Sequence, residues 1–361
     1  MSKCRILPID AQVFITEAFR SEGFADQSAQ EAAETLIYAD IAGYSSHGIS
    51  NFLPIYAHAL HKGYIHPANR LTIRNDGGAV LALEAQGMMG LMAGRAAMNT
   101  AIERAAIYGV AAVTVSHSSH FGAAGFYSSM AMRKDMIGIA MTNLGAQPVA
   151  HAMASRNPII GTNPIAMAAP VRDLAPFVLD MSTTVCASGK IKQANILGES
   201  CPPGWLLNAS GESEVDPASY FDGESFLPTL GGWSMGTGGH KGYGLNLLVE
   251  VLCGLLAGAD VPTLGKAGLQ NNIGHFFLVL DIRRWSEPAD FAGRMKSWCE
   301  SLLGQATFPG FPQISYPGHP DGIHAEQTRM RGFLIAEEVF RDLNSYAASR
   351  SLSPLQGASE W

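Results

Sequence analysis

Apolar residues recur at three-to-four-residue spacing from 8 to 42, a pattern that predicts two helices separated at Gly23. Asp26 is the expected N-cap residue of the second helix. The same spacing predicts a short helix over 52–62 that ends at Gly63, and an Ala-rich helix over 91–108 that ends at Gly109. The first third of the chain is therefore expected to be largely helical.

Shorter apolar runs predict the strands. Alternation over 71–85 around Gly77 and Gly78 is typical of a hairpin, and continuous apolar runs predict strands over 110–116, 136–143, 164–170, 176–182 and 274–282. Residues 201–233 are expected to be rich in loops, and 291–304 to form a helix. The run from 242 to 259 is interrupted by Glu250, so we expect a buried core helix there and no membrane span. Together these elements predict an α/β protein.

Composition excludes several classes of function. The chain has 361 residues, 47% of them hydrophobic, which is enough to bury a sizeable core. A net charge of −7 with scattered basic residues argues against a nucleic-acid surface. Five cysteines without CxxC spacing predict neither a disulfide framework nor structural zinc. The N-terminus lacks the apolar core of a signal peptide, so a cytoplasmic protein without membrane partners is expected.

The usual phosphate-binding motifs are absent from the sequence. Neither G-x-G-x-x-G after an early strand nor G-x-x-x-x-G-K-[ST] occurs, and the similar glycine spacing at 236–242 lies late in the chain. If a dinucleotide binds, a fold other than the Rossmann fold is expected to hold it.

Histidines form the most suggestive groups. His47 lies in the glycine-bounded turn GYSSHGISNF (43–52), where it either ends a helix or transfers a proton to a ligand. His117 and His120 follow the strand expected over 110–116. Taken alone, each histidine has a structural explanation that is at least as good as a catalytic one. A further group at 58, 61 and 66 has no carboxylate or thiolate in the same turn, so no metal site is expected.

Two segments leave a choice open. LDMSTT (179–184) ends an apolar strand with an acid and hydroxyl groups, which suit either a helix N-cap or a ribose and phosphate cradle. GHKGYG (239–244) places Lys241 among glycines, which let a backbone approach a ligand closely. The residue chemistry alone favours neither alternative.

Eight segments, in this order, resemble the malate/L-lactate dehydrogenase family, whose relatives include ureidoglycolate dehydrogenases and piperideine/pyrroline-2-carboxylate reductases. They are ADIAGYSSHGI (39–49), SSHFGAAGFY (118–127), GTNPIAMAAP (161–170), LDMSTT (179–184), GKI (189–191), GGHKGYGLNLLVE (238–250), GHFF (274–277) and PGHP (317–320). The resemblance implies a non-Rossmann α/β fold with a largely antiparallel central sheet and helical terminal regions. It also implies an NADH- or NADPH-dependent oxidoreductase that works as a homodimer on a small-molecule substrate. We expect residues 1–115 and 280–361 on the substrate side and 116–279 to bind the cofactor.

Site residues follow from the resemblance, position by position. His47 corresponds to the proton donor, and His120 to the acid/base described in some relatives; Ser46, Asn51 and Thr162 are expected on the substrate side. Cofactor contacts are implied for Asp180, Met181, Ser182, Thr183, His240, Lys241, Gly242, Gly318 and His319. An imidazole that titrates near neutrality suits the proton transfer that accompanies hydride transfer.

Departures from the family pattern bear on the substrate. The family usually reads SHGxxR with a carboxylate-binding arginine, and here that position is Asn51, which cannot form a bidentate charged pair. Ser45 replaces an acid before the motif, and His319 replaces the glutamate of PGE. A 2-oxo acid or a cyclic imine-2-carboxylate is the expected substrate, with 2-hydroxy or cyclic amino acids in reverse. A non-catalytic nucleotide-binding protein and a zinc hydrolase using His58, His61 and His66 are the alternatives.

Overall fold

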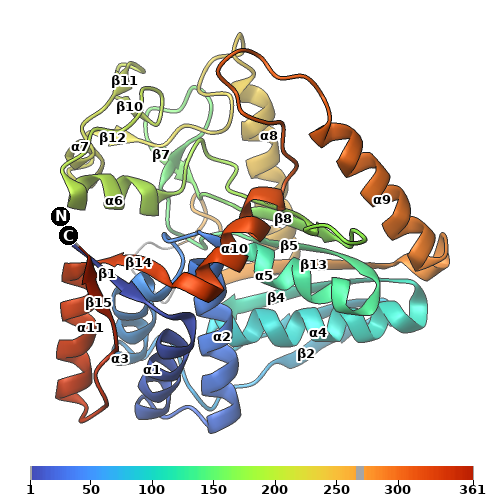
Figure 1. Ribbon diagram of the computed structural model, residues 1–361, viewed down its shortest axis with the longest axis horizontal. Coiled ribbons are helices and arrows are strands. Elements are labelled where there is room, and N and C mark those ends of the chain that lie inside the picture. The colour runs from blue at the N-terminus through green and yellow to red at the C-terminus, as the bar shows by residue number, and fades with distance from the viewer. Residues whose placement is uncertain (1, 266–271, 361) are drawn as a thin grey trace.

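A seven-stranded sheet forms the centre of the protein, in the order β2-β3-β4-β13-β5-β8-β9 (Figure 1). The computed structural model describes residues 2–265 and 272–360. Neighbouring strands are antiparallel except β3 and β4, which are parallel. The strands are β2 (Thr72–Asp76), β3 (Val80–Glu84), β4 (Val110–Ser118), β5 (Met136–Thr142), β8 (Ile165–Ala169), β9 (Phe177–Met181) and β13 (Ile273–Asp281). The predicted hairpin, the predicted strands and the largely antiparallel sheet are confirmed.

The two faces of this sheet are covered differently. Helices α4 (Gly90–Tyr108) and α5 (Ala124–Met130) lie on one face, where Phe277 and Val279 of β13 join the main core. Phe276, which directly precedes Phe277 in the sequence, points to the other face and packs with Cys253. This alternation is the period of two that a strand imposes on its side chains.

Helices from both ends of the chain form a second body beside the sheet (Figure 1). It contains α1 (Pro8–Ser21), α2 (Asp26–Ala42), the short helices η1 (Ile49–Asn51), η2 (Phe52–Ala57) and α3 (His58–His61), α10 (His319–Arg331) and α11 (Glu337–Ser349). A small sheet of β14 (Phe333–Ala336), β1 (Lys3–Ile6) and β15 (Ala358–Glu360) brings the two termini together. The predicted N-cap is wrong: Ala25 occupies that position, and Asp26 is the first helical residue, with its carboxylate paired to Arg20.

Short elements fill the rest of the chain. Two small sheets and two helices lie above the central sheet: β6 (Ala150–His151), β7 (Pro158–Ile160), β10 (Leu206–Asn208), β11 (Ser213–Glu214), β12 (Ser225–Phe226), α6 (Ser188–Leu197) and α7 (Ala218–Phe221). The 3-10 helices η3 (Ala131–Lys134) and η5 (Ile282–Arg284) and helix α9 (Pro288–Leu303) complete the fold. The central sheet contains strands from both expected regions, residues 1–115 and residues 116–279. The division of the chain into a substrate side and a cofactor side stays a prediction.

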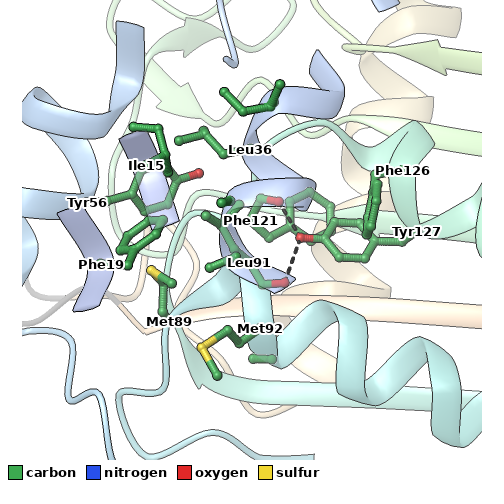
Figure 2. Packing of buried hydrophobic residues seen from close by; sticks show 14 of the residues in the cluster. Ile15, Phe19, Leu36, Tyr56, Met89, Leu91, Met92, Phe121, Phe126 and Tyr127 are labelled. Carbon is green, nitrogen blue, oxygen red and sulfur yellow. Dashed lines mark hydrogen bonds between the residues drawn. The ribbon is translucent and has the colours of Figure 1, made fainter. Parts of the chain in front are cut away.

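The main core joins the sheet to the helical body (Figure 2). Phe19 of α1 packs edge-on against Phe52 and Tyr56 of η2. Phe121, which follows β4, stacks on Tyr127, whose hydroxyl donates to the main-chain carbonyls of Leu91 and Phe121. These fully buried rings fix the segment after β4 against the segment after α2.

The segment from 239 to 256 is only half buried, which corrects the predicted core helix. It forms α8 (Gly239–Val249) and the π-helix η4 (Glu250–Leu256), with Val249, Glu250 and Cys253 facing the sheet. The opposite stripe is exposed and apolar: Leu245, Leu247, Leu248, Val251, Leu255 and Leu256. One helix can present only one stripe to a sheet, so a run that is apolar all round leaves the other stripe uncovered. Within the described residues, no helix is long and apolar enough to cross a membrane.

Candidate active site

The turn that carries His47 is held by a buried carboxylate. Helix α2 ends at Gly43, whose φ of 89° is the left-handed conformation common at helix ends. Asp40, in the last turn of α2, accepts a hydrogen bond from the backbone N–H of Ile49 at 2.7 Å. Gly48 lies so close that a Cβ there would be 2.1 Å from the Asp40 carboxyl atoms. A helix end and a glycine therefore present His47 in a fixed direction.

The two histidines singled out by the sequence meet in space. Their rings stack with centroids 5.8 Å apart and an interplanar angle of 18°. The Ser46 hydroxyl bonds His47 Nδ1 at 2.8 Å, and the Tyr56 hydroxyl bonds His120 Nδ1 at 2.9 Å. The backbone N–H of Gly122 donates to the same His120 nitrogen at 3.3 Å, so neutral His120 carries its hydrogen on Nε2.

Both histidines are held in the neutral form. Burial lowers the pKa of His47 to about 4. Burial, and then the nearby His47, lowers the pKa of His120 to about 3. A neutral imidazole has an unprotonated ring nitrogen at physiological pH, which a general base requires, and the lowered pKa makes it a weaker base than an exposed histidine.

Asp40 makes folding stability depend on pH. Burial raises the pKa of Asp40 to about 8, against 3.8 for its ordinary value. The folded state thus binds this proton more tightly than the unfolded state, and the stabilising effect of protonation is lost as pH rises from about 4 through about 8. We expect Asp40→Asn to flatten the fall in unfolding free energy between pH 5 and pH 9, measured by urea titration. Asp26→Asn, at an exposed carboxylate, is the matched control, and an Asp40→Asn curve that falls as steeply as wild type would contradict the assignment.

A cavity of about 840 Å³ opens beside His47, within the range of small-molecule sites. Its walls come from the 43–47 turn, the 122–124 segment, the end of β9, and α6. Of the site residues predicted from the sequence, this cavity brings together Ser46, His47, Thr162, Asp180, Met181 and Ser182. His120 lies behind His47 and is not among the lining residues.

The end of β9 supplies an acid and hydroxyl groups to the cavity. Asp180 accepts the backbone N–H of Gly125 at 2.7 Å, and burial raises its pKa to about 7. Thr183 points the other way: it is fully buried, and its hydroxyl donates to the carbonyls of Thr162 and Asn163. Because side chains alternate along an extended segment, Ser182 and Thr184 line the cavity while Thr183 faces the interior.

Asn51 and two predicted cofactor segments lie outside this lining. The Asn51 side chain donates to the Ser46 carbonyl at 2.8 Å and faces an adjoining groove. His240 and Lys241 are exposed on the first turn of α8, while Gly242 packs against the backbone of Leu230, which does line the cavity.

The segment at 317–319 supports β9 from behind. The backbone N–H of Val178 donates to the Pro317 carbonyl at 3.0 Å, and Gly318 has a φ of 91° where a Cβ would strike the backbone of Pro176. The His319 ring packs against Tyr316 at an interplanar angle of 33°, and its Nδ1 bonds the Ser315 hydroxyl. The cofactor contacts expected at these positions stay predictions.

Several lining or supporting residues were not identified from the sequence. Tyr44, Asp321, Lys190 and Trp205 line the cavity, and Tyr56 holds His120. Lys190 lies within the GKI segment and Tyr44 within ADIAGYSSHGI, so the family pattern offered a signal for both. The other three carry no local signal, because their roles depend on contacts between distant segments.

Over residues 2–265 and 272–360, no three His, Cys, Asp or Glu side chains lie together in a way that could hold a metal ion. His61, one of the three histidines weighed for zinc, is bonded to Glu22 and Arg350.

Comparisons with known proteins agree with this architecture. The family model described as malate/L-lactate dehydrogenase matches residues 8–344. The malate dehydrogenase of Pyrococcus abyssi is 35% identical over 337 residues, which cover 92% of this chain and 91% of that protein. The L-sulfolactate dehydrogenase of Methanothermobacter thermautotrophicus is 31% identical and covers 93% of this chain and 94% of its own length. The structure of malate dehydrogenase from Entamoeba histolytica matches with a TM-score of 0.93 at 26% identity, covering 97% of this chain and 99% of that one. The chain therefore belongs to the malate/L-lactate dehydrogenase family and is an NAD-dependent oxidoreductase.

Proposed function

We propose that this protein transfers hydride between a nicotinamide cofactor and C2 of a small 2-oxo acid or cyclic imine-2-carboxylate, with His47 as the group that carries the proton. The observation that supports this most is the pair of neutral, stacked imidazoles at the wall of a cavity large enough for both ligands. In the reverse direction the substrate is a 2-hydroxy acid or a cyclic amino acid.

The cavity residues suit a dinucleotide. Ser182 and Thr184 offer hydroxyl groups, Asp180 and Asp321 offer carboxylates for ribose hydroxyls, and Trp205 offers an aromatic surface. Gly125 approaches Asp180 so closely that a Cβ would be 2.8 Å from its carboxylate oxygen, which keeps that acid in one orientation. The nicotinamide ring, when bound, supplies the hydride acceptor for oxidation and the hydride donor for reduction.

His47 carries the proton in this mechanism. Its Nδ1 is engaged by the Ser46 hydroxyl, so Nε2 is the ring nitrogen available to a ligand. In oxidation Nε2 takes the proton of the substrate hydroxyl while the hydrogen on C2 leaves with its electron pair. The serine hydroxyl both donates and accepts, so it stabilises either tautomer of the imidazole. In reduction the imidazolium form returns the proton to the carbonyl oxygen or imine nitrogen.

His120 is a positioning residue in this proposal. Its Nδ1 is fixed by Tyr56 and the Gly122 N–H, and its ring stacks on His47. Burial and the nearby His47 lower the pKa of His120, so His120 stays neutral and adds no second positive charge to the site. The stack therefore holds the His47 ring plane toward the cavity.

The substrate class is tested by the decay of nicotinamide absorbance with NADH and NADPH in parallel. The panel contains pyruvate, oxaloacetate, phenylpyruvate, a 2-oxo acid with methylamine, and piperideine- and pyrroline-2-carboxylate. Turnover of any 2-oxo acid or cyclic imine, lost in His47→Asn, is the expected result. Cofactor binding without turnover of any panel member would overturn the proposed function and favour the non-catalytic alternative.

The charges around the cavity favour NADH over NADPH. Glu199 and Asp321 line it together with Asp180, whose pKa of about 7 leaves it partly charged near neutral pH, against one lysine, Lys190, among the lining residues that the structure describes. A phosphate at the ribose 2′ position adds negative charge to an already negative site. We expect kcat/KM to be at least about tenfold higher with NADH than with NADPH. Asp321→Asn is expected to reduce this preference for NADH. Equal or better use of NADPH by the wild-type enzyme would contradict this prediction.

We also propose that the enzyme is a homodimer joined through the exposed stripe of α8 and η4. Leu255 and Leu256 are each 58% exposed, and Leu245, Leu247, Leu248 and Val251 of the same helical segment are also exposed apolar side chains. Contiguous apolar surface on a soluble protein is typical of an interface, and a twofold axis pairs one such stripe with its own copy.

A charge on this stripe tests the dimer. Wild type is expected to have twice the mass of one chain by light scattering after gel filtration. Leu255→Glu and Leu248→Glu are each expected to shift the protein to monomer, because a buried unpaired carboxylate costs several kcal/mol. Ile107→Glu is the control, because Ile107 is an exposed residue of α4, and it should leave the mass unchanged. A wild-type monomer, or glutamate variants that stay dimeric, would exclude this interface.

A further inference from the structure

A second cavity of about 460 Å³ lies next to the catalytic one. It is bounded by the turn after His47, by α6, and by β14 with the start of α11, so it sits where the helical body meets the cofactor side. We refer to it as the tail groove. No residue of the proton-transfer mechanism other than Ser46 lines it.

The tail groove and the catalytic cavity share four lining residues. Ser45, Ser46, Gln193 and Leu197 line both. Gln193 is exposed and Leu197 only half-buried, so neither side chain is locked into the core. Ser45, Ser46, Gln193 and Leu197 therefore separate a ligand bound at His47 from the adjoining tail groove.

The chemistry of the tail groove suits hydrocarbon. Its floor consists of the aliphatic side chains of Leu53, Ile196, Leu334, Ile335 and Val339. Leu334 is 38% exposed although it is a large apolar residue on a strand. Charged side chains at the groove are of both signs, Lys3 and Lys192 against Glu338 and Asp342, so no net charge selects a second ionic group.

Asn51 gives the tail groove little capacity to bind the carboxylate of the substrate. Asn51 lines the groove, and one of its two Nδ2 hydrogens is already donated to the Ser46 carbonyl. A neutral, partly engaged amide gives little binding to a carboxylate. The groove is therefore suited to the end of the substrate remote from the carboxylate.

We infer that the tail groove binds the apolar tail of the substrate, so that the enzyme prefers 2-oxo acids with a long aliphatic side chain. This inference rests on the proposed function. With the reacting carbon at His47, a side chain of several methylenes passes Ser46 and Leu197 and lies on Ile196 and Val339. Each methylene moved from water to this surface is expected to raise kcat/KM about fourfold until the groove is filled.

The test compares kcat/KM for pyruvate, 2-oxobutanoate, 2-oxohexanoate and 2-oxooctanoate. Wild type is expected to show a rising series. Val339→Trp and Ile196→Trp, which fill the groove from opposite walls, are each expected to flatten it, so that one suffices if the other fails to fold. Val13→Trp, on the exposed side of α1, is the matched control and should keep the rising series. A flat wild-type series, or variants that keep the wild-type slope, would overturn the inference.

A binding measurement separates this inference from the proposed function. Octanoate binding to the protein is followed by calorimetry, which requires no turnover. Binding to wild type that weakens at least tenfold in Val339→Trp supports the groove even if no 2-oxo acid is reduced. Absence of octanoate binding to wild type, or equal binding to the variant, overturns the groove even if short 2-oxo acids are good substrates.

Discussion

Replacing His47 with asparagine is expected to lower kcat/KM by about 10²- to 10⁴-fold, the usual contribution of a positioned acid–base group. Asparagine keeps a polar atom near the position of Nδ1, so the bond to Ser46 persists while the titrating nitrogen is lost. Cofactor affinity, measured by fluorescence titration with NADH, is expected to change little. The loss then lies in the chemical step.

The dependence of the reaction rate on pH gives a second test of the role of His47. Since burial lowers the pKa of His47 to about 4, oxidation by wild type is expected to be flat between about pH 6 and 9, because the base is already neutral there. Reduction is expected to slow as pH rises, because it needs the imidazolium form. His117→Asn is the matched control, since His117 is half exposed and pairs with Glu84. If His120→Asn lost more activity than His47→Asn and also lost the pH dependence, His120 would be the proton carrier.

Gly48→Ala is expected to impair both folding and activity. The new Cβ would lie 2.1 Å from the Asp40 carboxyl atoms, and Asp40 is buried in the main helical body. Overpacking of this kind costs about 1–3 kcal/mol, and here relief requires moving the residue next to His47. We expect a lower urea midpoint and a kcat/KM reduced by at least about tenfold, because small displacements of catalytic groups have large effects on rate.

Gly304→Ala serves as the control for this substitution. A Cβ at Gly304 would lie 3.4 Å from the Glu300 carbonyl oxygen, so alanine fits there with ordinary contacts. Its stability and activity should match wild type. A Gly48→Ala enzyme with wild-type stability and rate would show that Asp40 does not fix the turn.

Local patterns were sufficient to predict most of the secondary structure. The break at Gly23, the hairpin before α4 and the strand β13 follow from periodicity and turn residues that a short window contains. The two-faced burial of α8 could not be predicted in this way. Its sequence is apolar all round, and which stripe meets the sheet depends on Phe276 and Met141, which lie far away in the chain.

The candidate site could be predicted only in part for the same reason. The family pattern identified His47, His120 and Asp180, and the first two lie in one ring stack. Tyr56 is 64 positions from His120 and reads as an ordinary core aromatic until the fold brings the hydroxyl to Nδ1. Asp40 likewise reads as one polar position in α2, and its role appears only when the turn folds back over it.

Hydride transfer itself is the most direct test of this mechanism. NADH carrying deuterium at both hydrogen positions of nicotinamide C4 would be incubated with the enzyme and the best substrate of the panel, and the product analysed by mass spectrometry and NMR. We predict deuterium on C2 of the product from wild type, in equal amount to the NADH consumed, and a rate at least about 10²-fold lower in His47→Asn. Product without deuterium at C2, or transfer that proceeds equally fast without His47, would contradict the mechanism proposed for this site.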